Sequence, residues 1–255
     1  MSRPVQALNR VIALLAVAVA IGSLFVVPTS TLGWAFDIAI RTYATFVASV
    51  MAHEAVHGHL GRRRVSNAFG RLALVPACVP FVSFRRTHVM HHAHTNEASR
   101  DPDLFLKAPY TALTLLRCVL LPHSWIFWLR RHRPLRQKQL IEIGVSYALM
   151  ITLYLALGTH VGFWRVGLGM TASLVLASIL SWYPFGVLTH EGFSTGGPET
   201  RSHDFFGYPL FWITLGCSLH RAHHQNPRRS WLELLPMVRR APTATLGFLS
   251  RDIRS

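Results

Sequence analysis

Three short clusters of histidine are the residues of this 255-residue chain best suited to chemistry. Two of them share the spelling H-x-x-H-H although they lie more than a hundred residues apart, and the first reads H-E-A-V-H. Residues three or four positions apart share one face of a helix, so each cluster can direct two or three imidazoles at one point. Neutral imidazole is the commonest protein ligand for transition metals. The eight histidines are too many for one ion and suit two: His53, His57, His88, His91, His92, His220, His223 and His224.

The first cluster also has a second interpretation. It is a literal H-E-x-x-H motif, in which zinc proteases use the two histidines to bind Zn²⁺ and the glutamate, here Glu54, as general base. An intramembrane zinc metalloprotease is therefore an alternative. That site needs only one further ligand, however, and gives no reason for two H-x-x-H-H clusters elsewhere in the chain.

The amino-acid composition of the whole chain indicates a membrane protein. The chain is 51% hydrophobic and only 15% charged, and its mean hydropathy is +0.30. A net charge of +15 would suggest nucleic-acid binding in a soluble protein. Here the arginines flank long apolar runs, so anionic lipid headgroups are the expected counter-charge and nucleic acid is not an expected partner. The three scattered cysteines form no C-x-x-C pair, which indicates neither a disulfide framework nor an iron–sulfur site.

Four apolar runs are long enough to cross a hydrocarbon core about 30 Å thick. They predict spans at about 11–28, 34–52, 140–157 and 166–188. A cleaved signal peptide is the alternative for the first run, which follows Arg3 and Arg10, but the run is long for such a peptide. In the second span Asp37 and Arg41 stand four residues apart and can form a pair near the outer interface.

Other apolar runs are expected to lie along the membrane surface. Residues 65–84 and 110–129 are bordered by basic residues at both ends, so crossing would export a basic cluster against the positive-inside rule. The run 205–219 is only fifteen residues long and is expected to form a final interfacial or cavity-lining helix.

The resulting topology places all three histidine clusters on one side. With a cytoplasmic N-terminus, residues 53–138 and 190–255 lie in the cytosol and hold nearly all of the Lys and Arg. The sequence thus predicts an all-α integral membrane protein with one domain, residues 1–255. It has four transmembrane helices, interfacial helices, and a cytosolic cap that carries a histidine-rich dimetal site. We expect a bacterial inner membrane, with both termini and the active site cytoplasmic.

Two imidazole-rich metal sites at a membrane face suit oxygen activation better than hydrolysis. Zinc has no redox chemistry, whereas imidazole binds Fe(II) well. A diiron centre can accumulate the oxidising equivalents needed to take hydrogen from an unactivated C–H bond. Hydrocarbon chains are the abundant substrates at this location, so two Fe ions and O2 are the expected cofactor and co-substrate.

The stretches HEAVH, HVMHHAHTNEASRDPD and HRAHHQNPRRSWLELLP resemble the three histidine boxes of the membrane fatty acid desaturase and hydroxylase superfamily. That superfamily includes carotenoid ketolases and hydroxylases and alkane monooxygenases, and the resemblance covers most of residues 45–237. It implies a mushroom-like helical fold with four spans, two irons in a cytosolic cap, and an enclosed lipid channel. It also implies a ninth ligand about thirty residues before the third box, where His190 stands. Where animal acyl-CoA desaturases have an asparagine that contacts a metal through water, this chain has Gly186.

Ligating imidazoles need their second ring nitrogen oriented, commonly by a carboxylate. The candidates near the boxes are Glu54, Asp101, Asp103 and Glu191, with helix capping or pairing with arginine as the alternative. His59 and His94 adjoin boxes without matching the pattern. The remaining histidines are expected outside the site: His123, His132 and His203 at the interface, and His160 on the outer side.

The resemblance implies a membrane-bound, O2-dependent diiron oxidase of a lipid hydrocarbon chain. HHAHTN followed by DPD favours a fatty acyl desaturase, whereas the short chain favours a carotenoid or other lipid hydroxylase or ketolase. A metal-binding membrane protein or transporter would need polar residues along an ion path, and only Asp37 and Arg41 are available. No electron-carrying domain is visible, so we expect a separate ferredoxin-like donor or reductase that binds the basic cytosolic face.

Overall fold

A computed structural model describes residues 2–193, 196–197 and 200–240; the final part of the predicted cap, 241–255, lies outside these residues. Within them every regular element is helical. The α-helices are α1 (Arg3–Gly22), α2 (Thr31–Val56), α3 (Arg63–Ala73), α4 (Phe81–His94), α5 (Thr111–His132), α6 (Gln137–Val161), α7 (Phe163–Trp182), α8 (His220–Gln225) and α9 (Trp231–Arg240). Short helical turns join them at η1 (Ser23–Phe25), η2 (Pro102–Leu106), η3 (Tyr183–Val187), η4 (Leu188–His190), η6 (Tyr208–Leu210) and η7 (Cys217–Leu219).

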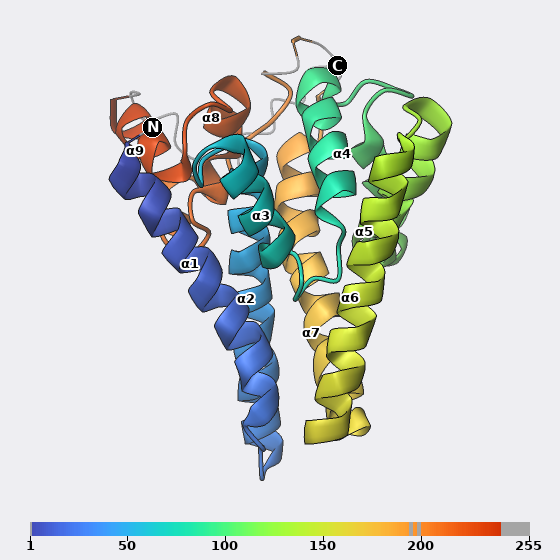
Figure 1. Cartoon of the computed structure of the whole chain (residues 1–255). Helices are drawn as coiled ribbons and strands as arrows, with labels where there is room; N and C mark the ends of the chain where they lie inside the picture. Colours follow the sequence, from blue (N-terminus) through green and yellow to red (C-terminus); the bar gives the residue numbers. More distant parts are fainter. Residues whose placement is uncertain (1, 194–195, 198–199, 241–255) are drawn as a thin grey trace.

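Two pairs of long helices carry a broad end of the molecule. Figure 1 shows α1 beside α2 and α6 beside α7, with α3, α4, α8 and α9 gathered at the end where the N-terminus lies. We call this end the cap end. Helix α2 packs on both α1 and α7 and joins the two pairs. Because α2 and α7 both run towards the cap end, both deliver their last residues there.

Turn chemistry fixes the ends of the long helices. At the far end from the cap, the Ser30 hydroxyl accepts a hydrogen bond from the Gly33 N–H at 3.1 Å and caps the start of α2. Gly162 separates α6 from α7 with φ of 94°, a backbone conformation that glycine adopts without steric cost. The chain can therefore reverse within one residue and send α7 back beside α6.

The pairing of Asp37 with Arg41 that the sequence predicts is confirmed. The Arg41 guanidinium donates to the Asp37 carboxylate and, at 3.1 Å, to the Ser23 hydroxyl, and both charged side chains are buried. A Cβ at Gly169 of α7 would lie 2.5 Å from Arg41 Nη1, so the absence of a side chain there makes room for the guanidinium. The hydrogen bond from Arg41 to Ser23 joins α2 to η1 inside the apolar region.

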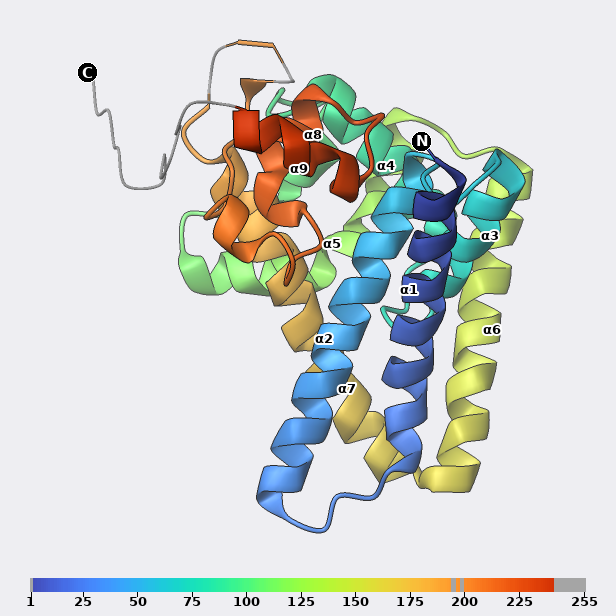
Figure 2. The same ribbon diagram turned by 90° about the vertical axis from the view of Figure 1, so that its left-hand side faces the viewer.

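Within the described residues, five helical stretches are long and apolar enough to cross a membrane: Arg3–Phe25, Thr31–Val56, Thr111–His132, Gln137–Val161 and Phe163–His190. Three of them contain a predicted span in full, and Arg3–Phe25 covers the predicted span 11–28 only as far as Phe25. The fifth is α5, predicted to lie along the interface. Figure 2 shows that α5, near its Thr111 end, crosses the direction of α1, α2 and α6. Length and composition alone therefore do not distinguish four spans from five.

Two of the expected surface helices are interrupted. The run 65–84 is not one helix: α3 ends at Ala73, turns follow, and α4 begins at Phe81 directly after Pro80. Proline lacks an N–H and disfavours helical backbone in the residue before it, which breaks the run. The run 205–219 contains only short 3-10 turns, because Gly207 and Gly216 take positive φ angles of 53° and 80°.

An aromatic cluster positions α4, the helix of the second histidine box. The Phe84 ring centroid lies 5.4 Å from Trp125 of α5 and 6.1 Å from Trp182 of α7, and Trp125 and Trp182 are 5.2 Å apart. Trp125 is fully buried. Such ring pairs add about 0.5–1.5 kcal/mol beyond area burial, so they fix α4 between the two helices.

Candidate metal centre

Five imidazoles from three distant segments meet at the cap end. They are His53 and His57 of the first box, His88 and His92 on α4, and His223 on α8, and their ligand atoms all lie within 4.8 Å of one another. Consecutive Nε2 atoms are 3.0 Å apart in the order His57, His88, His92, His223, His53. Helical spacing explains the local part, since 53 and 57, and 88 and 92, are each four residues apart.

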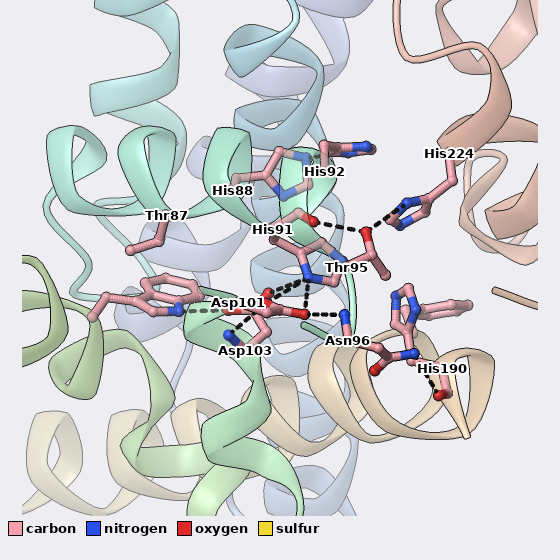
Figure 3. A network of polar contacts seen from close by, with 12 residues as sticks. Thr87, His88, His91, His92, Thr95, Asn96, Asp101, Asp103, His190 and His224 are labelled. Atoms are coloured by element: carbon pink, nitrogen blue, oxygen red, sulfur yellow. Dashed lines mark hydrogen bonds and ion pairs between the residues drawn. The ribbon is translucent and has the colours of Figure 1, made fainter. Parts of the chain in front are cut away.

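A second group of four imidazoles lies beside the first. It contains His91 on α4, His190 of η4, and His220 and His224 on α8. His220 Nε2 is 2.8 Å from that of His190 and 3.1 Å from that of His224. Figure 3 shows His88 and His92 apart from His91, which faces Asp101, with His190 and His224 beyond it.

The two H-x-x-H-H boxes are used in complementary ways. Helix α4 sends its i, i+4 pair, His88 and His92, to the five-membered group and the intervening His91 to the other. Helix α8 does the reverse, because His220 and His224 join the four-membered group and His223 the five-membered one. Because α4 and α8 each contribute to both groups, the two groups lie next to each other.

The nitrogen spacing tests which metal the residues fit. Ligand nitrogens at about 2.1 Å from an ion are about 3.0 Å apart when they subtend a right angle and about 3.4 Å apart in a tetrahedron. The observed Nε2 separations of 2.8 to 3.1 Å match right angles. Five donors in one group also exceed the four of a structural zinc. The residues present therefore fit five- or six-coordinate ions such as Fe(II).

Electrostatics keep most of these imidazoles neutral. Burial, followed by neighbouring imidazoles, lowers the pKa well below the ordinary value for His57, His88, His92, His220, His223 and His224. A neutral imidazole has a free lone pair for a metal. The groups are thus preorganised to bind cations and not protons.

His91 differs because two carboxylates approach its Nδ1. Burial lowers the pKa of His91, but Asp101 and Asp103 outweigh it and raise the pKa to about 9. Asp101 Oδ1 is 3.0 Å and Asp103 Oδ2 3.6 Å from His91 Nδ1. Asp101 is itself held by the N–H groups of Asn96 at 2.7 Å and Asp103 at 2.9 Å. Asn96 reaches it with φ of 61°, a left-handed conformation that asparagine tolerates.

Asp103 and Glu54 also lie beside imidazoles of the two groups. Asp103 accepts a hydrogen bond from the Trp125 indole at 2.8 Å, and burial raises its pKa to about 6. Glu54 is buried, with Oε2 at 3.0 Å from His59 Nδ1 and Oε1 at 3.7 Å from His53 Nδ1. It also accepts the Trp231 backbone N–H at 3.3 Å. The Glu54 carboxylate is thus engaged on the Nδ1 side of His53, which disfavours the general-base role of a zinc protease.

Other expected residues lie outside the two groups. The Glu191 side chain is exposed and belongs to neither group of imidazoles, while its backbone carbonyl accepts from His203 Nε2 at 3.2 Å. His94 pairs with Glu97 at 3.2 Å, and His59 with Glu54, so neither joins a group.

Two imidazoles have Nδ1 partners other than carboxylates, which the sequence did not suggest. His190 Nδ1 donates to the Arg201 carbonyl at 2.9 Å, which leaves Nε2 facing the group. Thr95 Oγ1 lies 3.4 Å from His224 Nδ1, as drawn in Figure 3. Thr95 and Asn96 follow the second box directly, so HHAHTN was the available signal; nothing local marks Arg201.

An apolar cavity leads from the two groups into the helices. It encloses about 110 Å³ and is bordered at one end by His53, His88, His91, His220 and His223, and at the other by Thr45 and Leu174. Its walls between α2, α4, α5 and α7 include Phe46, Val50, Phe84, Trp125 and Phe185. A Cβ at Gly186, which also borders it, would lie 2.8 Å from Leu106 Cδ1, so a larger residue does not fit there without displacing Leu106. A hydrocarbon chain suits this lining.

Comparison with known families identifies the chain. Residues 28–246 match the model of the family described as Fatty acid desaturase. The matched range contains all nine imidazoles of the two groups. No curated protein matches the chain.

Proposed function

Because the chain belongs to the fatty acid desaturase family, we propose that it is a membrane-bound, O2-dependent oxidase that desaturates a fatty acyl chain with two iron ions. The observation that carries this proposal is the position of two imidazole groups at the end of one apolar cavity. A soluble metal-binding site would not need an apolar cavity, and a passive lipid site would not need nine converging imidazoles.

Each group of imidazoles would hold one iron. His53, His57, His88, His92 and His223 would bind the first, and His91, His190, His220 and His224 the second. When bound, the irons would supply the redox chemistry in which O2, two electrons and two protons remove two hydrogen atoms from adjacent carbons and yield two waters. The protein supplies position: His91 Nδ1 donates to the Asp101 carboxylate and His190 Nδ1 to the Arg201 carbonyl, which leaves Nε2 of each imidazole for a metal.

The apolar walls would bind and align the substrate. The hydrophobic effect favours an alkyl chain in this cavity by about 0.8 kcal/mol for each buried methylene. Aromatic side chains such as Phe84 and Trp125 restrict the lateral freedom of the chain beside His88.

The membrane arrangement belongs to the same proposal. The family and the five apolar helical stretches support an integral membrane protein. We place four spans in the membrane, α5 along its surface, and the cap end in the bacterial cytoplasm. Arg62, Arg63 and Arg64 are exposed near the start of α3, and such charges would attract anionic lipid and an acidic, ferredoxin-like electron donor.

Lipid analysis tests the proposal. The chain is expressed in membranes of defined lipids with a ferredoxin donor, and fatty acids and carotenoids are compared by mass spectrometry. We expect loss of two hydrogen atoms from an acyl chain and two irons per chain by metal analysis. His91→Ala should abolish the product, whereas His160→Ala, at an exposed position near the end of α6, should not. A product that gains an oxygen atom would instead indicate a hydroxylase, and one zinc per chain a protease.

A further inference from the structure

A second cavity reaches the metal centre from a different direction. It encloses about 310 Å³ between the segment that follows the second histidine box and the end of the η3–η4 segment. Its deep end is formed by the buried residues His91, Asp101 and His190. Its outer end includes Lys107 and Glu191, which are exposed. The cavity therefore extends from the protein surface to the four-imidazole group.

The lining of this cavity differs from that of the apolar one. It contains two aspartates, an asparagine, a lysine, a glutamate and a threonine in addition to the two histidines: Asp101, Asp103, Asn96, Lys107, Glu191 and Thr114. A buried water needs two to four polar partners and about 30 Å³, so the cavity has room for roughly ten waters. Away from its imidazoles and the two carboxylates beside them, the apolar cavity is bordered by the hydroxyls of Thr45, Ser49, Ser178 and Ser181 but by no charged side chain.

Hydrogen bonds hold the walls of this second cavity, called the polar cavity below, in place. Arg117 Nη1 donates to the carbonyls of Phe105 and Lys107, and its guanidinium lies 5.4 Å from the Phe105 ring centroid. On the opposite side, Asn96 Nδ2 donates to the His190 carbonyl at 3.1 Å and to the Arg201 carbonyl at 3.4 Å. These contacts hold the two walls at fixed positions, so the space between them is a feature of the fold.

The two cavities meet without merging their linings. His91, Asp103 and Gly186 border both of them, and every other lining residue belongs to only one. Leu106 packs so close to Gly186 that a single methyl group would clash. Only a thin partition therefore separates the side that would take a lipid from the polar side.

We propose that the polar cavity is a water-filled route between the cytosolic phase and the four-imidazole group, separate from the cavity that takes the lipid. The inference rests on the proposed function, because that reaction would consume protons and release water at metals held by the two groups of imidazoles. An apolar passage filled by an alkyl chain cannot carry either, because such cavities stay dry. The route lets water reach the metals while the substrate seals the other side.

Cysteine accessibility tests this route without metal or turnover. Thr114→Cys places a thiol in the polar cavity and Ser178→Cys places one in the apolar cavity. A charged, membrane-impermeant thiosulfonate should modify the first at least about tenfold faster than the second, a ratio that separates an open path from one that needs local opening. Uncharged N-ethylmaleimide should modify both thiols. The parent chain, with Cys78, Cys118 and Cys217, gives the background.

A blocking substitution completes the test. Ala108→Trp fills the cavity and should slow charged labelling of the Thr114→Cys chain at least about tenfold. Ala112→Trp, at an exposed position on α5 outside the cavity lining, should leave the rate unchanged and controls for added bulk. Equal charged labelling of the thiols at 114 and 178, or no effect of Ala108→Trp, would overturn the route. Lipid oxidation by the parent chain is measured separately. Failure of the water route can therefore be distinguished from failure of the proposed function.

Discussion

Asp101→Asn tests whether a proton competes with a metal ion for the His91 imidazole. The substitution keeps the shape of the side chain but removes the charge that faces His91 Nδ1 at 3.0 Å. Removing a carboxylate that orients a ligating histidine costs about 10- to 100-fold in metal affinity. If orientation were the sole effect, this loss would be the same at every pH.

Proton competition changes that expectation. In the metal-free protein the pKa of His91 is about 9, above its ordinary value of 6.5. A proton therefore opposes metal binding about 100-fold at pH 7 but only about twofold at pH 9. In Asp101→Asn much of this competition disappears, because only Asp103 then opposes the effect of burial and the pKa of His91 falls. The two effects should nearly cancel at pH 7, whereas at pH 9 the variant should bind metal roughly tenfold or more weakly.

The assay is titration of the metal-free protein with Co²⁺, whose visible absorption reports coordination, at pH 7 and pH 9. Glu142→Gln is the control, because Glu142 forms a partly exposed pair with Arg71 away from the imidazoles. It should bind Co²⁺ like the parent at both values. An equal loss of affinity at pH 7 and pH 9 in Asp101→Asn would refute proton competition at His91.

The same raised pKa predicts a pH-dependent stability of the metal-free protein. A group whose folded pKa exceeds its unfolded value stabilises the fold below the unfolded value, here 6.5, and this contribution is lost as pH rises through about 9. Thermal unfolding of the metal-free chain should therefore show a midpoint that falls between about pH 7.5 and 9, because one unit above 6.5 the six imidazoles of lowered pKa are neutral in both states and only His91 still changes. A flat profile there would contradict the pairing. Asp37→Ala should cost about 3–5 kcal/mol, because it leaves the buried Arg41 charge without a partner. Unfolding in detergent measures the loss, which should be smaller in Asp37→Ala/Arg41→Met; equal losses would show that the pair is unimportant. Gly216→Ala should destabilise by about 1–3 kcal/mol, because φ is 80° and the new Cβ would lie 2.7 Å from Trp231 Cβ. An unchanged unfolding midpoint would show that the turn before η7 relaxes freely.

Local sequence determined the residue types of the site and the positions of most helices. The i, i+3 and i, i+4 spacings within each box align imidazoles on one helical face whatever surrounds them. Long apolar runs form helices in any apolar environment, because their backbone groups must bond within the segment. The resemblance to the desaturase superfamily is confirmed by the family match over residues 28–246. The sequence shows Pro80 and Gly216, but it does not show whether these residues interrupt a helix that the apolar pattern favours.

Only the tertiary structure decided how the imidazoles are divided. Nothing in the spelling H-x-x-H-H tells that His91 departs from its own box to join His190, or that His223 joins His53. Those assignments depend on the relative rotation of α4 and α8, which packing with other helices sets. The orienting carbonyl of Arg201 and the two separate cavities likewise arise between segments distant in sequence. Spacing along a chain fixes directions within one helix, whereas the meeting point of several helices depends on every side chain packed between them.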